Sequence, residues 1–141
     1  MDSLTKQQRS EVMSRVRSKD TVPERRVRRL VSSLGVRYRL HGARLPGRPD
    51  LVLTGRRKVI FVHGCFWHRH PRCKLARMPK SRVAFWREKL DGNRHRDLVN
   101  QRRLKRLGWR LMVVWECELA DEGKLLDRLR TFLLEDEREV H

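Results

Sequence analysis

The stretch LVLTGRRKVIFVH at residues 51–63 indicates the fold, because it holds two short apolar runs separated by a turn. Residues 51–54 and 58–62 have the aliphatic, β-branched composition of strands, and the Gly-Arg-Arg between them supplies the turn. The second run, with four apolar residues after Lys58, is apolar enough for a strand inside a sheet. Two polar groups flank this pair: Asp50 lies at the mouth of the first strand and His63 at the end of the second.

Helical patterns flank this strand pair. Thr21, Pro23 and Glu24 predict a helix start with a capping box, and Gly35 ends that helix. Periodicity and turn residues predict a strand at 36–40 and a loop at 41–49. They then predict helices at 81–90 and 94–108 with an interruption at 91–93, followed by a buried strand at 109–116. The last element is an amphipathic helix with apolar residues at helical spacing: Leu125, Leu126, Leu129, Phe132 and Leu133.

The charge of the chain indicates a polyanionic partner. Lys plus Arg number 35 against 17 Asp plus Glu, so the formal net charge is +18 and the sequence pI about 11.4. Nucleic acid is the favoured partner, with an anionic membrane as the competitor. No apolar run approaches the roughly 18 residues needed to span a bilayer, and the N-terminus lacks a signal-peptide apolar region. We expect a cytoplasmic, nucleoid-associated monomer that binds no membrane.

The order of the elements predicts the fold class. A chain of 141 residues is about one domain. Helix, three strands, helix, strand and helix in that order favour an α/β sandwich with a mixed central β-sheet flanked by α-helices. Ahead of this core, the pattern of residues 5–17 predicts a polar helix with Met13 on its apolar side, which fits packing on DNA as well as packing on the core.

The cysteines and histidines are concentrated in one segment. Three cysteines cannot all pair within one chain, and a reducing compartment disfavours even one disulfide. Cys65, His70 and Cys73 lie within nine residues, and Cys117 lies at the exit of a strand, so a tetrahedral Cys3His zinc site is chemically reasonable. The alternative is that the cysteines are buried as small hydrophobic residues and the histidines are solvated.

Asp50, Glu24, His63 and His68 are the candidate catalytic groups. A carboxylate at a strand start can hold Mg²⁺ against a phosphate oxygen, although Asp50 is also a common turn residue. The two histidines that a zinc site leaves free can transfer protons near neutral pH, as a nuclease requires, although a structural role is the alternative for each. Glu24 belongs to a capping box, so a catalytic role requires the helix N-terminus to face the site.

Adjacent aromatic residues, Phe66 and Trp67, follow the first cysteine of this segment. Aromatic rings flanked by cations can insert between base pairs, at roughly a few kcal/mol of unstacking per step, which a mismatch reduces. Burial in the core is the alternative. Trp109 and Trp115 lie on or beside an apolar strand and are assigned to the core, while the surroundings of Trp86 fit either role.

Several motifs occur together in one order: LPGRPD at 45–50, VIFVHGCFWHRH at 59–70, AFWREKL at 84–90, Gly92 and Asn93 with Asp97, and LGWRLMVVWEC at 107–117. MSRV and SKDT precede them near the N-terminus. Over about residues 8–120 this set resembles the very-short-patch repair endonucleases. Because several long motifs agree in order, the resemblance is far more specific than any one of them.

The resemblance implies a restriction-endonuclease-like fold and an enzyme that uses Mg²⁺ to nick double-stranded DNA on the 5′ side of the T in a T:G mismatch, the product of 5-methylcytosine deamination. Asp50 then corresponds to the Mg²⁺-binding carboxylate, with the backbone carbonyl of Val62 as a further ligand. His63 lies where related nucleases have a lysine. His68 corresponds to the general acid or base, and Glu24 to a group that reaches the water network around the metal.

The resemblance also assigns the remaining motif residues, except Asp97, whose role it leaves open. The structural Zn²⁺ site corresponds to Cys65, His70, Cys73 and Cys117. The wedge that enters the duplex beside the mismatch corresponds to Phe66, Trp67 and Trp86, and further DNA contacts correspond to Met13 and Asn93.

A single endonuclease domain over residues 1–141 follows from the resemblance, with a DNA-contacting helical arm at 1–20 and a catalytic core at 21–136. A functional link to a cytosine-5 DNA methyltransferase and to repair proteins follows as well. Two other interpretations stay open: a zinc-stabilised DNA-binding protein without activity, and a nicking nuclease of the same fold with weak mismatch dependence.

Overall fold

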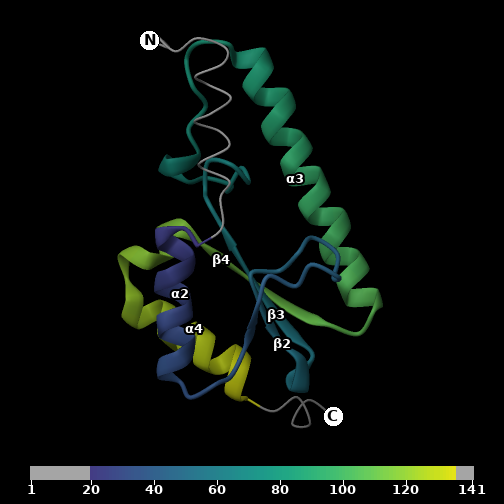
Figure 1. Cartoon of the computed structure of the whole chain (residues 1–141). Coiled ribbons are helices and arrows are strands. Elements are labelled where there is room, and N and C mark those ends of the chain that lie inside the picture. The colour runs from purple at the N-terminus through teal and green to yellow at the C-terminus, as the bar shows by residue number, and fades with distance from the viewer. Residues whose placement is uncertain (1–19, 136–141) are drawn as a thin grey trace.

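The computed structural model describes residues 20–135, which form a four-stranded sheet with helices on both faces (Figure 1). The helix predicted over residues 5–17, and Met13 with it, lies outside the described residues. None of the described helices is long and apolar enough to cross a membrane.

The sheet is mixed, as the sequence predicts. Its strands are β1 (Arg39–Leu40), β2 (Leu51–Leu53), β3 (Lys58–His63) and β4 (Arg110–Trp115), in that spatial order. β1 and β2 pair antiparallel, as do β2 and β3, whereas β3 and β4 are parallel, with His63 opposite Trp115. The start of β2 and the ends of β3 and β4 therefore meet at one edge of the sheet.

Each face of the sheet has its own hydrophobic core, because side chains alternate along β2, β3 and β4. Helices α2 (Val22–Ser33) and α4 (Glu122–Leu134) cover one face, and α3 (Val83–Arg106) lies on the other and extends beyond the sheet (Figure 1). The face under α2 and α4 buries Val27, Val31, Val36, Leu51, Leu53, Ile60, Met112, Val114, Leu119, Leu125, Leu129 and Leu133. The face under α3 buries Val52, Val59, Phe61 and Leu104.

Helix α2 begins with the predicted capping box. The Thr21 hydroxyl accepts from the Glu24 N–H at 3.4 Å, and the Glu24 carboxylate accepts from the Thr21 N–H at 3.3 Å. These bonds satisfy N–H groups that the first turn leaves without partners. The Glu24 carboxylate is thereby held at the N-terminal end of α2, close to Asp50.

Two predicted boundaries are wrong. Helix α3 is continuous over 24 residues, so the interruption predicted at 91–93 does not occur. Leu90 and Leu104, both fully buried, lie on either side of Gly92, and their packing offsets the weak helix propensity of glycine. Strand β1 is two residues long instead of the predicted 36–40, because Val36 packs in the cluster under α2 and α4.

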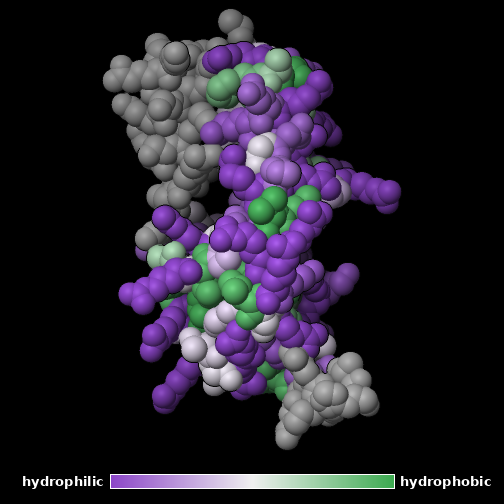
Figure 2. Space-filling model, turned by 90° about the vertical axis from the view of Figure 1, so that its right-hand side faces the viewer, coloured by the Kyte–Doolittle hydropathy of each residue, from purple (hydrophilic) through white to green (hydrophobic). Residues whose placement is uncertain are grey.

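The face of the molecule that carries α3 is hydrophilic. Figure 2 shows hydrophilic side chains over most of this face, with small separate hydrophobic patches. The last turn of α3 alone contributes Arg103, Lys105 and Arg106. Such a surface agrees with the polyanionic partner predicted from the net charge.

The continuous α3 makes Gly92 a position where stability can be gained. A Cβ at Gly92 would contact only the flexible end of Arg96, at 3.4 Å or more. We predict that Gly92→Ala raises the free energy of unfolding by roughly 0.5–1 kcal/mol, because alanine loses less backbone entropy in a helix. Gly108→Ala is the control of opposite sign, since Gly108 follows α3 at φ +89°. Urea denaturation measures both variants, and a destabilised Gly92→Ala protein would contradict the prediction.

Candidate active site

An open cleft of about 960 Å³ lies at the sheet edge where β2 begins and β3 ends. Its walls come from the start of α2, the loop before β2, the segment after β3 and the middle of α3. The polar side chains that line it include Glu24, Arg48, Asp50, His63, His68, Asn93, Arg96, Asp97 and Glu116. The four candidate catalytic groups, which are far apart in the sequence, therefore share one cleft.

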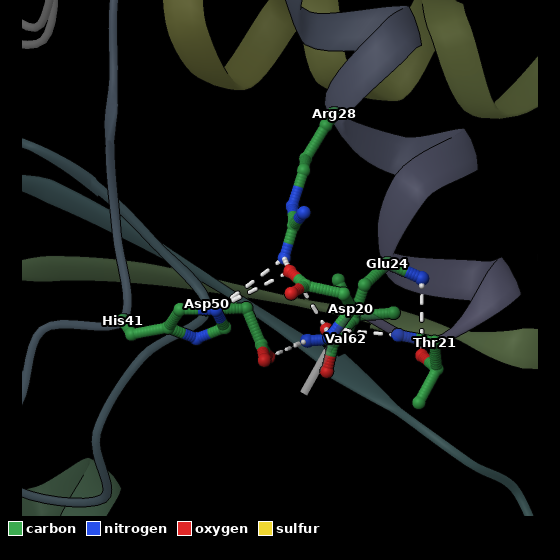
Figure 3. A network of polar contacts seen from close by, with 7 residues as sticks. All are labelled: Asp20, Thr21, Glu24, Arg28, His41, Asp50 and Val62. Carbon is green, nitrogen blue, oxygen red and sulfur yellow. Dashed lines mark hydrogen bonds and ion pairs between the residues drawn. The ribbon is translucent and has the colours of Figure 1, made fainter. Parts of the chain in front are cut away.

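Asp50 lies in this cleft next to Glu24. Asp50 Oδ2 accepts from the Val62 N–H at 2.6 Å, a bond that joins the start of β2 to the end of β3 (Figure 3). Burial, together with the neighbouring Glu24 carboxylate, raises the pKa of Asp50 to about 7, against the opposing effects of the Val62 N–H and Arg28. Two carboxylates held together with little solvent are oxygen ligands of the kind that divalent cations prefer.

Arg28 of α2 connects Glu24 to Asp20 and His41, two residues that the sequence does not predict as part of the site (Figure 3). Its Nη2 atom lies 2.7 Å from Asp20 Oδ1, 3.3 Å from Glu24 Oε2 and 3.5 Å from His41 Nε2. The Asp20 N–H also donates to Glu24 Oε2 at 2.7 Å. Among 35 basic residues the one signal that distinguishes Arg28 is its position four residues after Glu24, on the same side of the helix.

His63 and His68 stack on each other in the cleft, with ring centroids 3.8 Å apart and an interplanar angle of 5°. His68 Nδ1 lies 2.6 Å from Asp97 Oδ2, so Asp97 accepts a hydrogen bond from this nitrogen and Nε2 is left to exchange protons. Burial and the neighbouring His68 lower the pKa of His63 to about 3, so His63 is neutral near pH 7. The contact with His68 suggests a role for Asp97, which the motifs leave open.

Cys65, His70, Cys73 and Cys117 come together as one group, here called the Cys/His cluster. One ligand atom of each lies within 4.8 Å of those of the other three, and Cys117 Sγ is 3.5 Å from His70 Nδ1. The three cysteines are free thiols, and burial raises the pKa of Cys65 to about 12. Ligand atoms around a tetrahedral zinc ion are about 3.5–4 Å apart, so the cluster fits such an ion.

Phe66, Trp67 and Trp86 pack against one another. The ring centroids of the three pairs are 5.1, 5.4 and 5.9 Å apart, all in tilted or edge-on arrangements. None of the three belongs to either buried cluster of the described residues, which argues against the core interpretation. Asn93 Nδ2 donates to the backbone carbonyl of Trp67 at 3.0 Å and so ties this segment to α3.

The two tryptophans assigned to the core differ in their surroundings. Trp109 packs against the cluster under α3, as predicted, with Arg57 over its ring at 5.0 Å. Trp115 instead lies between His70 and His63, at centroid distances of 4.0 and 5.3 Å. Its assignment to the core is wrong, because the last position of β4 reaches the sheet edge beside the cleft.

Paired carboxylates beside a histidine–aspartate pair, in a strongly basic α/β protein, are typical of a nuclease. Residues 1–75 match the family model described as DNA mismatch endonuclease Vsr. The chain is 50% identical over 132 residues to the type II nicking enzyme V.XorIIP of Xanthomonas oryzae pv. oryzae, covering 94% of this chain and 96% of that protein. It is 44% identical over 135 residues to the DNA mismatch endonuclease Vsr of Escherichia coli K12, covering 96% of this chain and 86% of that protein.

The chain therefore belongs to the DNA mismatch endonuclease Vsr family and is an endonuclease that hydrolyses phosphodiester bonds of DNA. The family predicted from the motifs is confirmed. The interpretation as a DNA-binding protein without activity is wrong, because the family and the relatives are those of endonucleases.

A solved structure supports the fold. The catalytic domain of the homing endonuclease I-Bth0305I matches with a TM-score of 0.50 and 22% identity, covering 80% of this chain and 94% of that one. At this identity the likeness concerns the fold alone. The restriction-endonuclease-like α/β fold is thus confirmed.

The raised pKa of Asp50 predicts a pH-dependent stability in protein without added divalent salt. Since its folded pKa of about 7 exceeds its usual value of 3.8, Asp50 favours folding below pH 3.8 and loses this contribution as the pH rises through 7. Asp50→Asn cannot ionise, so we expect it to be more stable than the wild type at pH 8 by on the order of 1–3 kcal/mol. Urea denaturation at pH 4 and pH 8 measures the difference. An equal difference at both pH values would contradict the account.

Proposed function

We propose that this mismatch endonuclease nicks double-stranded DNA on the 5′ side of the T in T:G mismatches that arise by deamination of 5-methylcytosine, and that it requires Mg²⁺. The observation that carries the proposal is the single cleft in which the Asp50 and Glu24 carboxylates lie close to the His68–Asp97 pair. The identity to the DNA mismatch endonuclease Vsr of Escherichia coli supports a mismatch as the substrate.

Asp50 is the residue that would hold Mg²⁺, with Glu24 and the backbone carbonyl of Val62 beside it. Oxygen atoms of carboxylates and carbonyls are the ligands that suit Mg²⁺. The raised pKa of Asp50 supports the assignment, because a divalent cation would offset the repulsion between the Asp50 and Glu24 carboxylates. When bound, Mg²⁺ supplies positive charge that stabilises the phosphate as negative charge develops on it.

His68 is placed to move the proton that hydrolysis requires. A water oxygen forms a bond to phosphorus, the bond from phosphorus to O3′ breaks, and one proton passes overall from the water to the leaving oxygen. Asp97 holds His68 through Nδ1, so Nε2 is the atom that exchanges the proton. His63 stacks on His68 and is neutral, so it does not act as a cation there.

The Cys/His cluster is assigned to a structural Zn²⁺. Three of its residues lie in the segment after β3 and Cys117 follows β4, so an ion there would tie two strand ends together. All four ligand positions come from the protein, which is typical of structural rather than catalytic zinc sites.

Phe66, Trp67 and Trp86 are assigned to the wedge that enters the duplex beside the mismatch. Their packing against one another outside both cores supports a role at the DNA surface. Asn93, which holds the Trp67 segment, is assigned to the same DNA interface. Met13 is assigned to the minor-groove side of the DNA, on the arm of residues 1–20.

The wider proposal rests on the resemblance of the motifs to the very-short-patch repair endonucleases. Residues 1–141 form one endonuclease domain with its catalytic core at 21–136. The protein acts as a monomer on nucleoid DNA in the cytoplasm, in functional partnership with a cytosine-5 DNA methyltransferase and repair proteins.

A nicking assay on T:G, C:G and U:G duplexes and on single strands tests the catalytic roles. With Mg²⁺ we expect nicking of the T:G duplex on the 5′ side of the T. Asp50→Asn should abolish nicking with little loss of DNA binding, because Asp50 positions a metal rather than supplying affinity. His68→Ala should lower the rate by about 10²-fold or more, the usual scale for a general acid or base.

Asp121→Asn is the matched control for this assay, since Asp121 caps α4 and does not line the cleft. It should nick at the wild-type rate. Retained cleavage by Asp50→Asn would remove Asp50 from the mechanism. Equal nicking of T:G and C:G duplexes would instead favour a nicking nuclease with weak mismatch dependence.

The zinc assignment predicts one tightly held Zn²⁺ per chain, and unfolding when a strong chelator removes it, because structural zinc contributes folding free energy directly. Cys117→Ser should lower the melting temperature of the whole domain. His95→Ala, which changes an exposed histidine outside the cluster, should keep both zinc and stability. Elemental analysis and thermal denaturation measure these effects, and native protein that contains no zinc would refute the assignment.

The wedge assignment predicts that mismatch preference depends on the aromatic residues rather than on the arginines. Lys and Arg contacts with phosphate give affinity that falls with salt but is the same for every sequence. Trp67→Ala should remove roughly 1–3 kcal/mol of stacking, mostly from T:G binding, with the salt dependence nearly unchanged. Binding to T:G and C:G duplexes across a salt series measures this, with Arg96→Ala for comparison. Equal weakening of both duplexes would show that Trp67 is no wedge.

A further inference from the structure

We propose that Trp115 is a positioning residue that orients His63, and through it His68, by linking these rings to His70 of the Cys/His cluster. This inference rests on the proposed function, in which His68 exchanges a proton and the cluster holds zinc. Neither the motifs nor the relatives assign Trp115 a role.

Trp115 touches both groups at once. Parallel pairing of β3 and β4 sets Trp115 directly opposite His63, and the two rings meet edge to face with centroids 5.3 Å apart at 75°. His70 stacks flat on the same tryptophan, at 4.0 Å and 10°. His63 in turn stacks flat on His68, at 3.8 Å and 5°. Four rings thus form a continuous series from the Cys/His cluster to the His68–Asp97 pair.

The orientation of His63 depends on these ring contacts. Within residues 20–135 no hydrogen bond reaches the His63 ring, which is 5% exposed. Its aromatic neighbours are Phe61 at 5.6 Å, His68 and Trp115. A buried ring without hydrogen bonds is held by packing alone, so loss of the tryptophan leaves one side of it without support.

His68 needs this support, because its hydrogen bond to Asp97 fixes the position of Nδ1 but leaves the ring free to turn about that bond. The flat stack with His63 supplies the second constraint, which sets the plane of the ring and hence the direction of Nε2. A small misplacement of a catalytic group lowers the rate steeply, by up to roughly 100-fold for about 1 Å.

The other end of the series is anchored at the Cys/His cluster. His70 Nδ1 lies 3.5 Å from Cys117 Sγ, and Cys117 is only two residues beyond Trp115. A metal that binds the His70 nitrogen fixes the plane of that imidazole, and the flat stack passes this constraint to Trp115. Through this series of rings, the Cys/His cluster therefore influences the orientation of His63 and His68.

Trp115→Leu and Trp115→Phe test the proposal, since leucine keeps an apolar side chain without a ring and phenylalanine restores a ring. We expect Trp115→Leu to lower kcat roughly 10- to 100-fold with little change in KM and with zinc retained, and Trp115→Phe to recover most of the loss. Trp109→Leu, at a tryptophan outside the cleft, should leave kcat unchanged. The imidazole NMR resonances of His63 and His68 should shift in Trp115→Leu and stay unchanged in Trp109→Leu.

A double-mutant cycle with His68→Ala separates this proposal from the proposed function. If Trp115 acts through His68, Trp115→Leu has no further effect on kcat once His68 is alanine. The same fold-loss in both backgrounds, or unshifted histidine resonances, would overturn the role of Trp115 and leave that of His68 intact. A His68→Ala protein that nicks at full rate would overturn the proposed function itself. If Trp115→Leu fails to fold, the histidine resonances and kcat are compared between Trp115→Phe and the wild type. Wild-type resonances together with a tenfold lower kcat in Trp115→Phe would contradict the proposal.

Discussion

The hydrogen bond from the Val62 N–H to Asp50 Oδ2 is the contact on which the arrangement of the cleft depends. It forms because β2 and β3 pair antiparallel, so the start of one strand meets the end of the other. A shift of this register by one residue would turn the side chains of β2 to the opposite faces, and the two hydrophobic cores prevent that shift. The folding energy of the sheet therefore holds a carboxylate close to Glu24, where burial and repulsion raise its pKa.

The parallel pairing of β3 and β4 has the second large consequence. Residues that follow the two strand ends are brought side by side, so Cys117 donates its N–H to Cys65 Sγ at 3.4 Å while His63 faces Trp115. Glu116 accepts from the Cys65 N–H at 3.4 Å and also lines the cleft. The ends of β3 and β4 thus position both the Cys/His cluster and the candidate catalytic groups, so a change in either group affects the other.

Local patterns explain what could be predicted from the sequence. The capping box of α2, the two short strands and the closing amphipathic helix depend on residues that are close together in the chain, so the sequence predicts all of them. The contacts of Arg28, Asp97 and Trp115 are not predictable, although Asp97 and Trp115 lie in the motifs, because these contacts arise only when α2, α3 and β4 meet at the cleft. The continuity of α3 at Gly92 is not predictable for a related reason: the tertiary packing of Leu90 and Leu104 outweighs the weak helix preference of a glycine and its two neighbours. Cys117 was predictable as a ligand from its strand exit, but its distance to Cys65 depends on the β3–β4 register.

Mn²⁺ binding tests most directly whether the carboxylates at the sheet edge form a divalent cation site, as we propose. Mn²⁺ shares the oxygen ligands of Mg²⁺ and is detected by electron paramagnetic resonance. With the zinc content of each protein verified, the wild type and His68→Ala should bind Mn²⁺ with similar affinity, while Asp50→Asn should lose this binding. Mn²⁺ binding that is unchanged in Asp50→Asn would contradict the account.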